Sequence, residues 1–550
     1  MEFKKNQIVE LYIDDIGNEG EGIGHIDGYA LFLKDAVIGD KVRAKIIKTK
    51  KNYGFARVEE VIEASKDRVS PRCSKARQCG GCTLQHLAYE KQLEYKFNKV
   101  KNCLERIGGL ENIEEKMEPI LGMEEPFYYR NKAQFPVGYD KEGNLITGFY
   151  AGRTHHIIDC THCMIQHPVN EQILLKVLDY MKKNNITAYD EKTHKGLVRH
   201  IVTRVGFKTG EIMVCLVVNG SKKNLRNLEM LVDSLTEVEG MTSICVNINK
   251  EKTNRILGSK IEEVYGKPYI YDYIGNVKYQ IGPLSFFQVN PTQTKVLYEK
   301  AMEYADLKGE ETVWDLYCGI GTISLFLAQK AKKVYGVEIV KEAIDDARLN
   351  AKMNGFDNAE FFVGKAEEVL PREYEKNGVY ADTIVVDPPR KGCDSKLLET
   401  MVKMAPKRIV YVSCDPATLA RDLKVLSEQG YEVEKVCAVD QFSHSSHVET
   451  VVLLSKGMVD SRKVKVDFSL EDMDLSEFKG KATYEQIKEY VLEETGLKVS
   501  SLYIAQIKKK CGLDVGENFN PAKSENARQP QCTSEKEDAI MQAFRHFGII

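Results

Sequence analysis

Four short apolar segments between about residues 286 and 455 alternate with stretches of helical periodicity. The expected strands are Thr312–Leu316, Lys333–Val337, Thr383–Val386 and Arg408–Val412. Strands that alternate with helices are typical of βαβ units, which build a parallel sheet covered by helices. Ligands of such sheets bind at the carboxyl ends of the strands. The pattern therefore predicts an α/β domain whose functional residues directly follow its strands.

A glycine turn follows the first of these strands, in segment 313–322 (VWDLYCGIGT). Glycine lets the backbone pass close to a ligand. Asp315 precedes the glycines in the D-x-x-x-G-x-G pattern usual for S-adenosylmethionine, whereas Ser324 stands where a dinucleotide-binding fold has a third glycine. Glu338 follows the second strand, where a ribose would place its hydroxyls, and Asp387 adds a polar group at the same sheet edge. The alternative is a purely structural turn between strand and helix.

Two later segments carry groups suited to catalysis. The Asp-Pro-Pro of segment 386–390 (VDPPR) also occurs in methyltransferases acting on exocyclic amino groups, but an aromatic residue usually follows there and Arg390 follows here. Cys414 comes directly after the fourth strand, and Glu449 lies in the closing strands of the same fold. Taken singly, a buried small hydrophobic residue and a solvated carboxylate are the more ordinary interpretations. Together with the glycine turn, they predict a nucleophile and a general base.

Five cysteines form a pattern of their own. Cys73, Cys79 and Cys82 lie in a Gly-rich loop, and Cys160 and Cys163 follow later in the chain. Four thiolates suit either zinc or an iron–sulfur cluster. The spacing leaves zinc open as the better choice, because structural zinc prefers paired C-x2-C ligands. The 14 cysteines, without a secretory signal, indicate thiols, metal or catalysis rather than a disulfide framework.

Residues 1–63 have the pattern of short strands joined by Gly-rich turns, which fits a small β-barrel of the oligonucleotide-binding type. Tyr53 and Phe55 are interleaved with basic residues, which are Lys41, Arg43, Lys45, Lys48, Lys50, Lys51 and Arg57. Positive charge attracts phosphates and aromatic faces stack on bases, so the mixture suits single-stranded nucleic acid. The alternative is a strand edge kept soluble by lysines. The formal net charge of -3 does not exclude nucleic-acid binding, because binding needs only a local basic face.

The 550 residues predict about three or four domains, and 43% hydrophobic residues are enough to fill several cores. The expected domains are residues 1–63, 64–285, 286–455 and 456–550. Segment 1–10 is charged and lacks the apolar region of a secretory signal, and no stretch approaches the ~18 apolar residues of a membrane-spanning helix. We therefore expect a soluble, cytoplasmic protein that does not bind a membrane, and we expect a monomer.

The tail beyond residue 455 carries helix signals of its own. Charged residues 460–481 indicate a linker, after which Thr483 and Ser500 are expected to cap two helices separated by Gly496. Ser534 starts a third predicted helix. The first two helices resemble a helix-turn-helix, with lysines of the second as phosphate contacts. A small helical appendage that packs on the enzyme or on another protein is at least as good an interpretation.

Taken together, these motifs resemble the RNA uracil-5-methyltransferase family, in the branch with an N-terminal TRAM domain and an iron–sulfur cluster that acts on 23S ribosomal RNA. Residues 20–57 resemble the TRAM pattern, and residues 129–132 and 148–150 resemble the signature of the central domain. The resemblance covers about residues 1–455. It implies a TRAM barrel, a central α+β domain that binds RNA and a Rossmann-like class I methyltransferase domain, and it says nothing about the helical C-terminal extension.

The resemblance also assigns site residues. The S-adenosylmethionine contacts it implies are Gln288, Tyr317, Glu338 and Asp387. It makes Cys414 the nucleophile and Glu449 the base. The ligands it implies for a 4Fe-4S cluster are Cys73, Cys79, Cys82 and Cys163, with Cys163 preferred to Cys160.

The chemistry of uracil explains why a cysteine is wanted. Carbon C5 of uracil is a poor nucleophile, so a thiolate must add at C6 before C5 can attack a methyl group. A base then removes the C5 proton, and the uridine must be flipped out of any helix to reach the thiol. We therefore expect 5-methyluridine formation in ribosomal RNA. Methylation of transfer RNA by the same mechanism and a non-catalytic RNA-binding factor are the alternatives.

Overall fold

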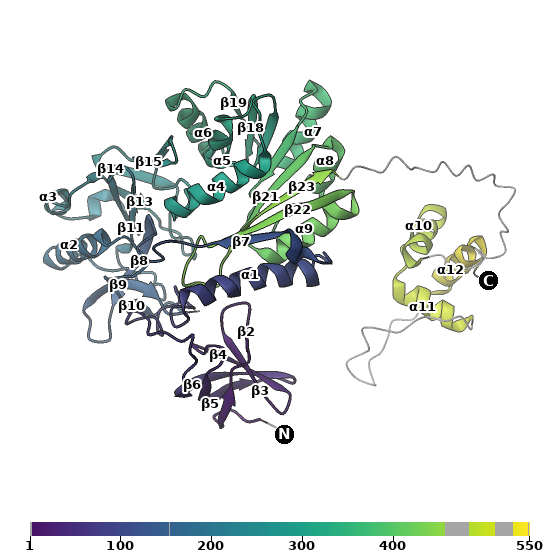
Figure 1. Ribbon diagram of the computed structural model, residues 1–550, viewed down its shortest axis with the longest axis horizontal. Coiled ribbons are helices and arrows are strands. Elements are labelled where there is room, and N and C mark those ends of the chain that lie inside the picture. The colour runs from purple at the N-terminus through teal and green to yellow at the C-terminus, as the bar shows by residue number, and fades with distance from the viewer. Residues whose placement is uncertain (1–2, 153, 457–482, 512–531, 548, 550) are drawn as a thin grey trace. The chain divides into compact units, whose positions relative to one another are not determined.

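The chain is described by a computed structural model (Figure 1). The described residues are 3–152, 154–456, 483–511, 532–547 and 549. They divide into two compact units, Met1–Val459 and Asp460–Ile550, each described by itself below. Among the described residues, no helix has the length and apolar character needed to cross a membrane.

The N-terminal sheet has the strand order β1-β5-β6-β4-β3-β2. Its strands are β1 (Ile8–Tyr12), β2 (Asp15–Ile16), β3 (Gly22–Ile26), β4 (Tyr29–Lys34), β5 (Lys41–Thr49) and β6 (Tyr53–Glu63). Side chains alternate along β5, so that Val42, Ala44 and Ile46 are fully buried. The β-sheet domain expected for this segment is confirmed.

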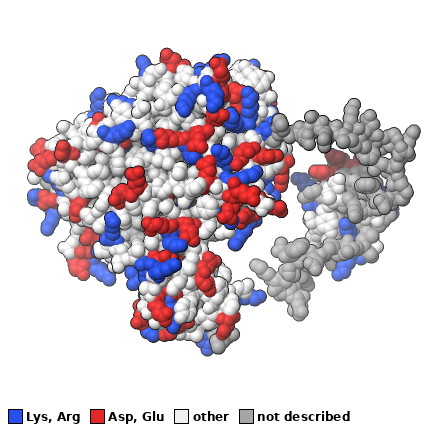
Figure 2. Space-filling model, viewed as in Figure 1, with Lys and Arg blue, Asp and Glu red and all other residues white. Residues whose placement is uncertain are grey.

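The basic residues of this sheet have acidic neighbours. Lys41, Arg43 and Arg57 each pair with a glutamate, and Lys and Arg are interspersed with Asp and Glu on the visible face of the first unit (Figure 2). Tyr53 and Phe55 are 39% and 38% exposed, with ring centroids 5.7 Å apart. The surface therefore presents aromatic rings near basic residues, of which Lys41, Arg43 and Arg57 are paired with glutamates.

The central sheet has the order β10-β9-β8-β11-β12-β13-β14. Its strands are β8 (Lys132–Tyr139), β9 (Leu145–Tyr150), β10 (Ile157–Asp159), β11 (Val198–Val205), β12 (Ile212–Val218), β13 (Met241–Ile248) and β14 (Lys260–Gly266). Helices α2 (Val169–Lys183) and α3 (Leu228–Thr236) pack together and share a hydrophobic core with this sheet. A separate hairpin, β15 (Ile270–Ile274) and β16 (Val277–Ile281), leads into the last sheet of the unit.

The third sheet has the order β19-β18-β17-β20-β21-β23-β22-β7. Its strands are β7 (Met117–Leu121), β17 (Thr312–Leu316), β18 (Lys333–Glu338), β19 (Ala359–Val363), β20 (Thr383–Val386), β21 (Arg408–Ser413), β22 (Tyr431–Val439) and β23 (Glu449–Lys456). All four expected strands are confirmed, and β17 to β21 are mutually parallel. Strand β19 was not expected from the sequence; it is a short edge strand with a charged residue, Glu360, at its second position.

Helices cover both faces of this sheet, as in a doubly wound α/β domain (Figure 1). The helices of one core are α4 (Pro291–Ala305), α5 (Thr322–Ala328) and α6 (Lys341–Met353). The helices of the opposite core are α7 (Ala366–Asn377), α8 (Ser395–Met404) and α9 (Pro416–Glu428). Trp314 of β17 is fully buried in the second core.

This sheet also takes residues from the segment expected to form the central domain. Helix α1 (Tyr89–Arg106) packs beside α9 and β7, and β7 pairs in parallel with β22 through Val436 and Met117 (Figure 1). An edge strand presents unpaired N–H and C=O groups, and β7 supplies partners for those of β22. The expected domain boundary at residue 285 therefore runs through this sheet, because β7 lies before it in sequence and the other seven strands lie after it.

The second unit contains α10 (Tyr484–Thr495), α11 (Ser501–Lys510) and α12 (Ser534–His546). Thr483 forms the expected capping box, and the Ser500 hydroxyl accepts a hydrogen bond from the Tyr503 amide at 3.3 Å. The third predicted helix begins at Ser534 as expected, and Thr533 is its N-cap residue. The predicted linker 460–481 lies outside the described residues. Nucleic-acid or protein binding by this unit stays a prediction, as does the monomeric state.

Candidate functional site

One cavity of about 890 Å³ opens at the carboxyl ends of β17, β18, β20 and β21. All six side chains expected to bind the cofactor or to act in catalysis line it, namely Gln288, Tyr317, Glu338, Asp387, Cys414 and Glu449. These residues come from six different positions spread over more than 150 residues of sequence. The parallel sheet brings four of them together, because Tyr317, Glu338, Asp387 and Cys414 lie at the carboxyl ends of its strands. Glu449 begins the antiparallel strand β23, and Gln288 shortly precedes α4.

The turn after β17 shapes one wall of this cavity. Tyr317 has a φ of 70° and Gly321 a φ of 82°, conformations that let the chain reverse tightly between β17 and α5. The Asp315 side chain is fully buried, and its Oδ2 accepts a hydrogen bond from the Ser324 hydroxyl. Its Oδ1 has no hydrogen-bond partner among the described residues. The serine that departs from the dinucleotide-binding pattern therefore orients the acid, whose second oxygen is left for a ligand.

The opposite wall combines a carboxylate with exposed apolar groups. Glu338 is the last residue of β18, lines the cavity and accepts a hydrogen bond from the Val340 amide through Oε1 at 2.9 Å. Ile339 is 60% exposed and Phe286 is 70% exposed, although both line the cavity. Large apolar side chains in a cavity are suited to cover a flat ring.

Cys414 and Glu449 lie at the same end of two neighbouring strands. Strands β21 and β23 are antiparallel, and Ser413 pairs with Thr450 in their register. Cys414 directly follows Ser413, and Glu449 directly precedes Thr450, so both side chains reach the cavity from adjacent backbone positions. Asp415 then caps α9 by accepting hydrogen bonds from two amides of its first turn, which fixes the short connection that holds the thiol.

Burial dominates the electrostatics of the cavity. It raises the pKa of Asp315 to about 7, helped by repulsion from Asp387 and Glu338. It also raises the pKa of Asp387 to about 7. The pKa of Glu449 rises to about 8 through burial and repulsion from Asp387, against a smaller opposing effect of Arg390.

The thiol responds to the same neighbours. Burial, followed by the negative charges of Glu449 and Asp387, raises the pKa of Cys414 to about 12, and Arg390 lowers it. Without a bound cation, the cysteine is therefore a neutral thiol near neutral pH. The cavity favours positively charged ligands, because a cation would relieve the repulsion among its carboxylates.

Several side chains that line the cavity were not expected at the site from the sequence, among them Tyr298, Arg390, Phe442 and His447. Arg390 directly follows Asp-Pro-Pro and His447 stands two residues before the predicted base, so proximity in sequence was an available signal. Tyr298 lies on α4 and Phe442 in the connection between β22 and β23. Only the tertiary structure brings these two to the site.

The loop that carries Cys73, Cys79 and Cys82, called the cysteine loop below, lies outside this cavity. Burial raises the pKa of the Cys82 thiol to about 12, with further contributions from Cys163, Cys79 and Cys73, so the structure brings these four thiols into mutual electrostatic reach. Cys160 differs in that its thiol donates a hydrogen bond to the His162 carbonyl at 3.3 Å. Among the described residues, no group of three or more His, Cys, Asp or Glu has the geometry of a metal site.

The raised pKa of Glu449 predicts a specific pH dependence of stability. The unfolded chain ionises this residue near 4.5 and the folded protein near 8, so the folded state holds an extra proton between these values and loses stability as pH rises through them. Glu449→Gln carries no ionisable group there. We expect its thermal midpoint, relative to that of the ligand-free wild type, to rise from about pH 5 to about pH 9. Glu432→Gln, at an exposed position of β22, is the control, and a pH-independent difference for Glu449→Gln would contradict the expectation.

Comparison with known proteins agrees with this geometry. A model of the tRNA (uracil-5-)-methyltransferase family matches residues 88–457, and a model of the TRAM domain matches residues 2–58. RNA methyltransferases of Clostridium tetani and Halalkalibacterium halodurans are 53% and 52% identical to the chain over 453 and 451 residues. Each alignment covers 82% of this chain and 97% of the relative.

A solved structure gives the same result. The tRNA (uracil-54, C5)-methyltransferase of Pyrococcus abyssi, crystallised with S-adenosyl-L-homocysteine, superposes with a TM-score of 0.66 at 29% sequence identity. The superposition covers 81% of this chain and the whole of that one. Since the family model matches more than half of its length, the chain belongs to the tRNA (uracil-5-)-methyltransferase family and is an RNA (uracil-5-)-methyltransferase with an N-terminal TRAM domain.

Proposed function

We propose that this enzyme forms 5-methyluridine in 23S ribosomal RNA by using S-adenosylmethionine and a transient covalent bond between Cys414 and carbon C6 of the target uracil. The observation that carries the proposal is the shared cavity, in which a thiol, a buried carboxyl and the glycine turn lie together. Nucleophilic catalysis needs the attacking group and the proton acceptor within reach of one reacting ring.

The residues of the cavity fit S-adenosylmethionine. Asp315 has an unpartnered buried oxygen, and Asp387 is a second, partly buried carboxyl that lines the cavity, so the site offers negative charge to the cationic amino acid and sulfonium portions. Glu338 is placed to accept hydrogen bonds from ribose hydroxyls, and the exposed Ile339 is suited to the adenine face. Gln288 and Tyr317 complete the proposed set of contacts. When bound, the cofactor supplies the methyl group.

Cys414 acts in the first proposed step. Positive charge held near Asp387 offsets the repulsion that keeps the thiol protonated, so it lowers the thiol pKa towards neutrality. The thiolate forms a bond to C6, and the electrons of the C5–C6 double bond move onto C5 and the C4 carbonyl oxygen. C5 can then form its bond to the methyl carbon, while the electrons of the old sulfur–methyl bond stay on sulfur.

Glu449 acts in the second proposed step. After methylation, C5 still carries its proton, and removing it restores the C5–C6 double bond and expels the Cys414 thiolate. A base with a pKa near the working pH is best suited to this transfer, and burial gives Glu449 a pKa of about 8. Without the base, the methylated RNA stays bonded to the enzyme.

The covalent step has a direct test. RNA that carries 5-fluorouridine at the target position should form a denaturation-resistant adduct in the presence of S-adenosylmethionine, because fluorine cannot leave as the proton does. Cys414→Ala should abolish the adduct. Cys103→Ala, which removes another half-exposed thiol on α1, should form it at the wild-type rate. An adduct that persists in Cys414→Ala would assign the nucleophile to another residue.

Transfer RNA is the second candidate substrate, and the similarity to the Pyrococcus abyssi enzyme favours it. The proposal of ribosomal RNA rests on the cysteine loop and the TRAM domain, both features of the ribosomal RNA branch that the sequence resembles. The exposed Tyr53 and Phe55 of the TRAM domain support binding of single-stranded RNA, since aromatic rings stack on bases.

Mapping of 5-methyluridine in cells with and without this gene separates the two substrates. We expect deletion to remove one or two defined marks from 23S ribosomal RNA and to leave transfer RNA unchanged. Restoring the wild-type gene should restore the marks, and restoring Cys414→Ala should not. Loss of a transfer-RNA mark instead would establish the alternative substrate.

We also propose that Cys73, Cys79, Cys82 and Cys163 hold a 4Fe-4S cluster. The donor set supports this because backbone amides of Gly81 and of Ile165 and Gln166 point at the sulfurs of Cys79 and Cys163, as expected for thiolates. The Cys160 thiol already donates to a backbone carbonyl, which favours Cys163 as the fourth ligand. Such a cluster would join loop segments that are distant in sequence.

Replacing each proposed ligand by serine should lower the iron and sulfide content of protein purified without oxygen, together with its visible absorption. Cys160→Ser is the matched control and should retain both. Zinc without sulfide in the wild type would exclude the iron–sulfur cluster while keeping the ligand set. Equal metal loss in Cys160→Ser and Cys163→Ser would contradict the choice between them.

A further inference from the structure

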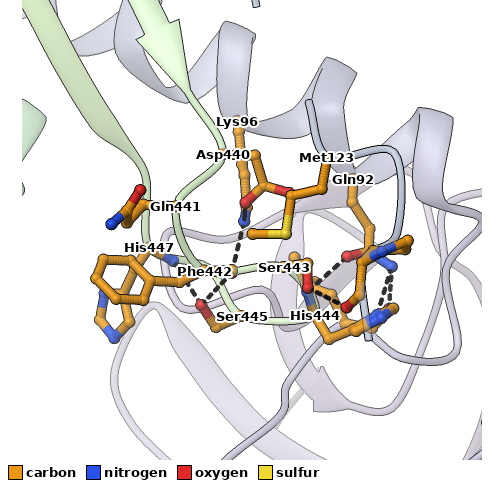
Figure 3. Close-up of polar contacts among 12 residues, drawn as sticks. Gln92, Lys96, Met123, Asp440, Gln441, Phe442, Ser443, His444, Ser445 and His447 are labelled. Atoms are coloured by element: carbon orange, nitrogen blue, oxygen red, sulfur yellow. Dashed lines mark hydrogen bonds and ion pairs between the residues drawn. The ribbon is translucent and has the colours of Figure 1, made fainter. Parts of the chain in front are cut away.

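The connection between β22 and β23, residues 440–448, leads directly into Glu449 and is called the base loop below. It also carries Phe442 and His447, which line the same cavity as Cys414. Figure 3 shows both side chains on this loop. The position of the proposed base therefore depends on how this loop is held.

A buried ion pair holds the beginning of the base loop. Lys96 of α1 donates hydrogen bonds to Oδ1 of Asp440 at 2.5 Å and to the Phe442 carbonyl at 2.9 Å (Figure 3). Both charged side chains are fully buried, and the Tyr89 hydroxyl donates to Oδ2 of Asp440 at 2.7 Å. Burial costs both ions their hydration, so the pair is satisfied only in a narrow range of geometries. Three bonds from one helix therefore fix the first residues of the loop.

A neutral side chain one turn earlier on α1 holds the middle of the loop. Oε1 of Gln92 accepts a hydrogen bond from the His444 amide at 2.9 Å, while its Nε2 donates to the carbonyls of Leu84 and Leu87. His444 has a φ of 62°, which a non-glycine residue adopts only when its surroundings enforce it. The amides of Thr83 and Leu84 donate to the His444 carbonyl at 2.8 and 3.0 Å.

These contacts lie behind the cavity rather than in it. Gln92, Lys96 and Asp440 are not among the described residues that line the cavity. Two hydrogen bonds join these side chains to the backbone of the base loop, one between Lys96 and the Phe442 carbonyl and one between Gln92 and the His444 amide. A displacement of α1 relative to β22 would therefore move the loop and with it Glu449. Thr83 directly follows Cys82, and the cysteine loop thus touches the same segment.

We propose that Gln92, Lys96 and Asp440 are positioning residues, which hold the base loop so that Glu449 meets the C5 proton of the methylated uracil. The inference rests on the proposed function, because it assigns a step of that reaction. Cys414 lies in a different connection, between β21 and α9. In that connection the Ser413 hydroxyl donates a hydrogen bond to the Asp415 carbonyl, and the Asp415 side chain accepts hydrogen bonds from two amides of α9. Loss of the α1 contacts therefore affects removal of the proton and leaves attack of the thiol largely unchanged.

Two variants test the proposal independently. Lys96→Met combined with Asp440→Asn removes both charges at once, so no single buried charge is left to prevent folding. Gln92→Met removes the bond to His444 without changing any charge. A displacement of about 1 Å in an active site can cost about 100-fold in rate. We expect release of methylated RNA to slow at least about tenfold in both variants, with covalently bound RNA accumulating as in Glu449→Gln.

The rate of adduct formation with 5-fluorouridine RNA should stay within about twofold of wild type in both variants, because it needs only the thiol and the methyl donor. Lys295→Met, which breaks an exposed ion pair on α4, is the matched control and should change neither rate. Release at the wild-type rate would overturn the proposal. An equal fall in release, adduct formation and S-adenosylhomocysteine binding would also overturn it, because that pattern is general loss of structure. If the wild type itself formed no adduct, the proposed function would fail instead.

Discussion

The antiparallel pairing of β21 with β23 is the constraint on which the site depends. In this register Ser413 lies opposite Thr450, which places Cys414 and Glu449 at the same sheet edge although 34 residues separate them in sequence. A shift of one residue would turn every side chain of β23 to the other face of the sheet. Burial on both faces prevents such a shift, since Val451, Val452 and Leu454 are fully buried. The hydrophobic core thus sets the geometry of the reacting groups.

Burial of acidic groups then gives the cavity its chemical character. Asp315 and Glu449 are almost completely removed from solvent and Asp387 is partly buried, and their pKa values rise to about 7, 8 and 7 respectively. Such groups are costly to the folded protein unless a cation or a proton satisfies them. The same property that suits the cavity to a cationic cofactor also leaves a base with a pKa close to neutral. The folded, ligand-free protein therefore loses stability as pH rises through these values.

The domains are joined through the active site more closely than their order in the chain indicates. Helix α1 and β7 precede the central sheet in sequence, yet both pack against the α/β sheet, and α1 holds the loop that carries Phe442. The end of the cysteine loop reaches the same loop through His444. The proposed cluster therefore has a physical connection to the proposed base.

The sequence by itself determined the parallel sheet, the glycine turn and the six side chains predicted to face one cavity. These are local signals, because a strand end, its turn residues and a reactive side chain occur together within short segments such as 313–322 and 412–416. Tertiary structure alone decided that α1 holds the base loop and that Tyr298 and Phe442 line the cavity. It also paired Lys41, Arg43 and Arg57 of the TRAM domain with glutamates. The physical reason is that register, burial and long-range ion pairs depend on packing between segments, which no short pattern encodes.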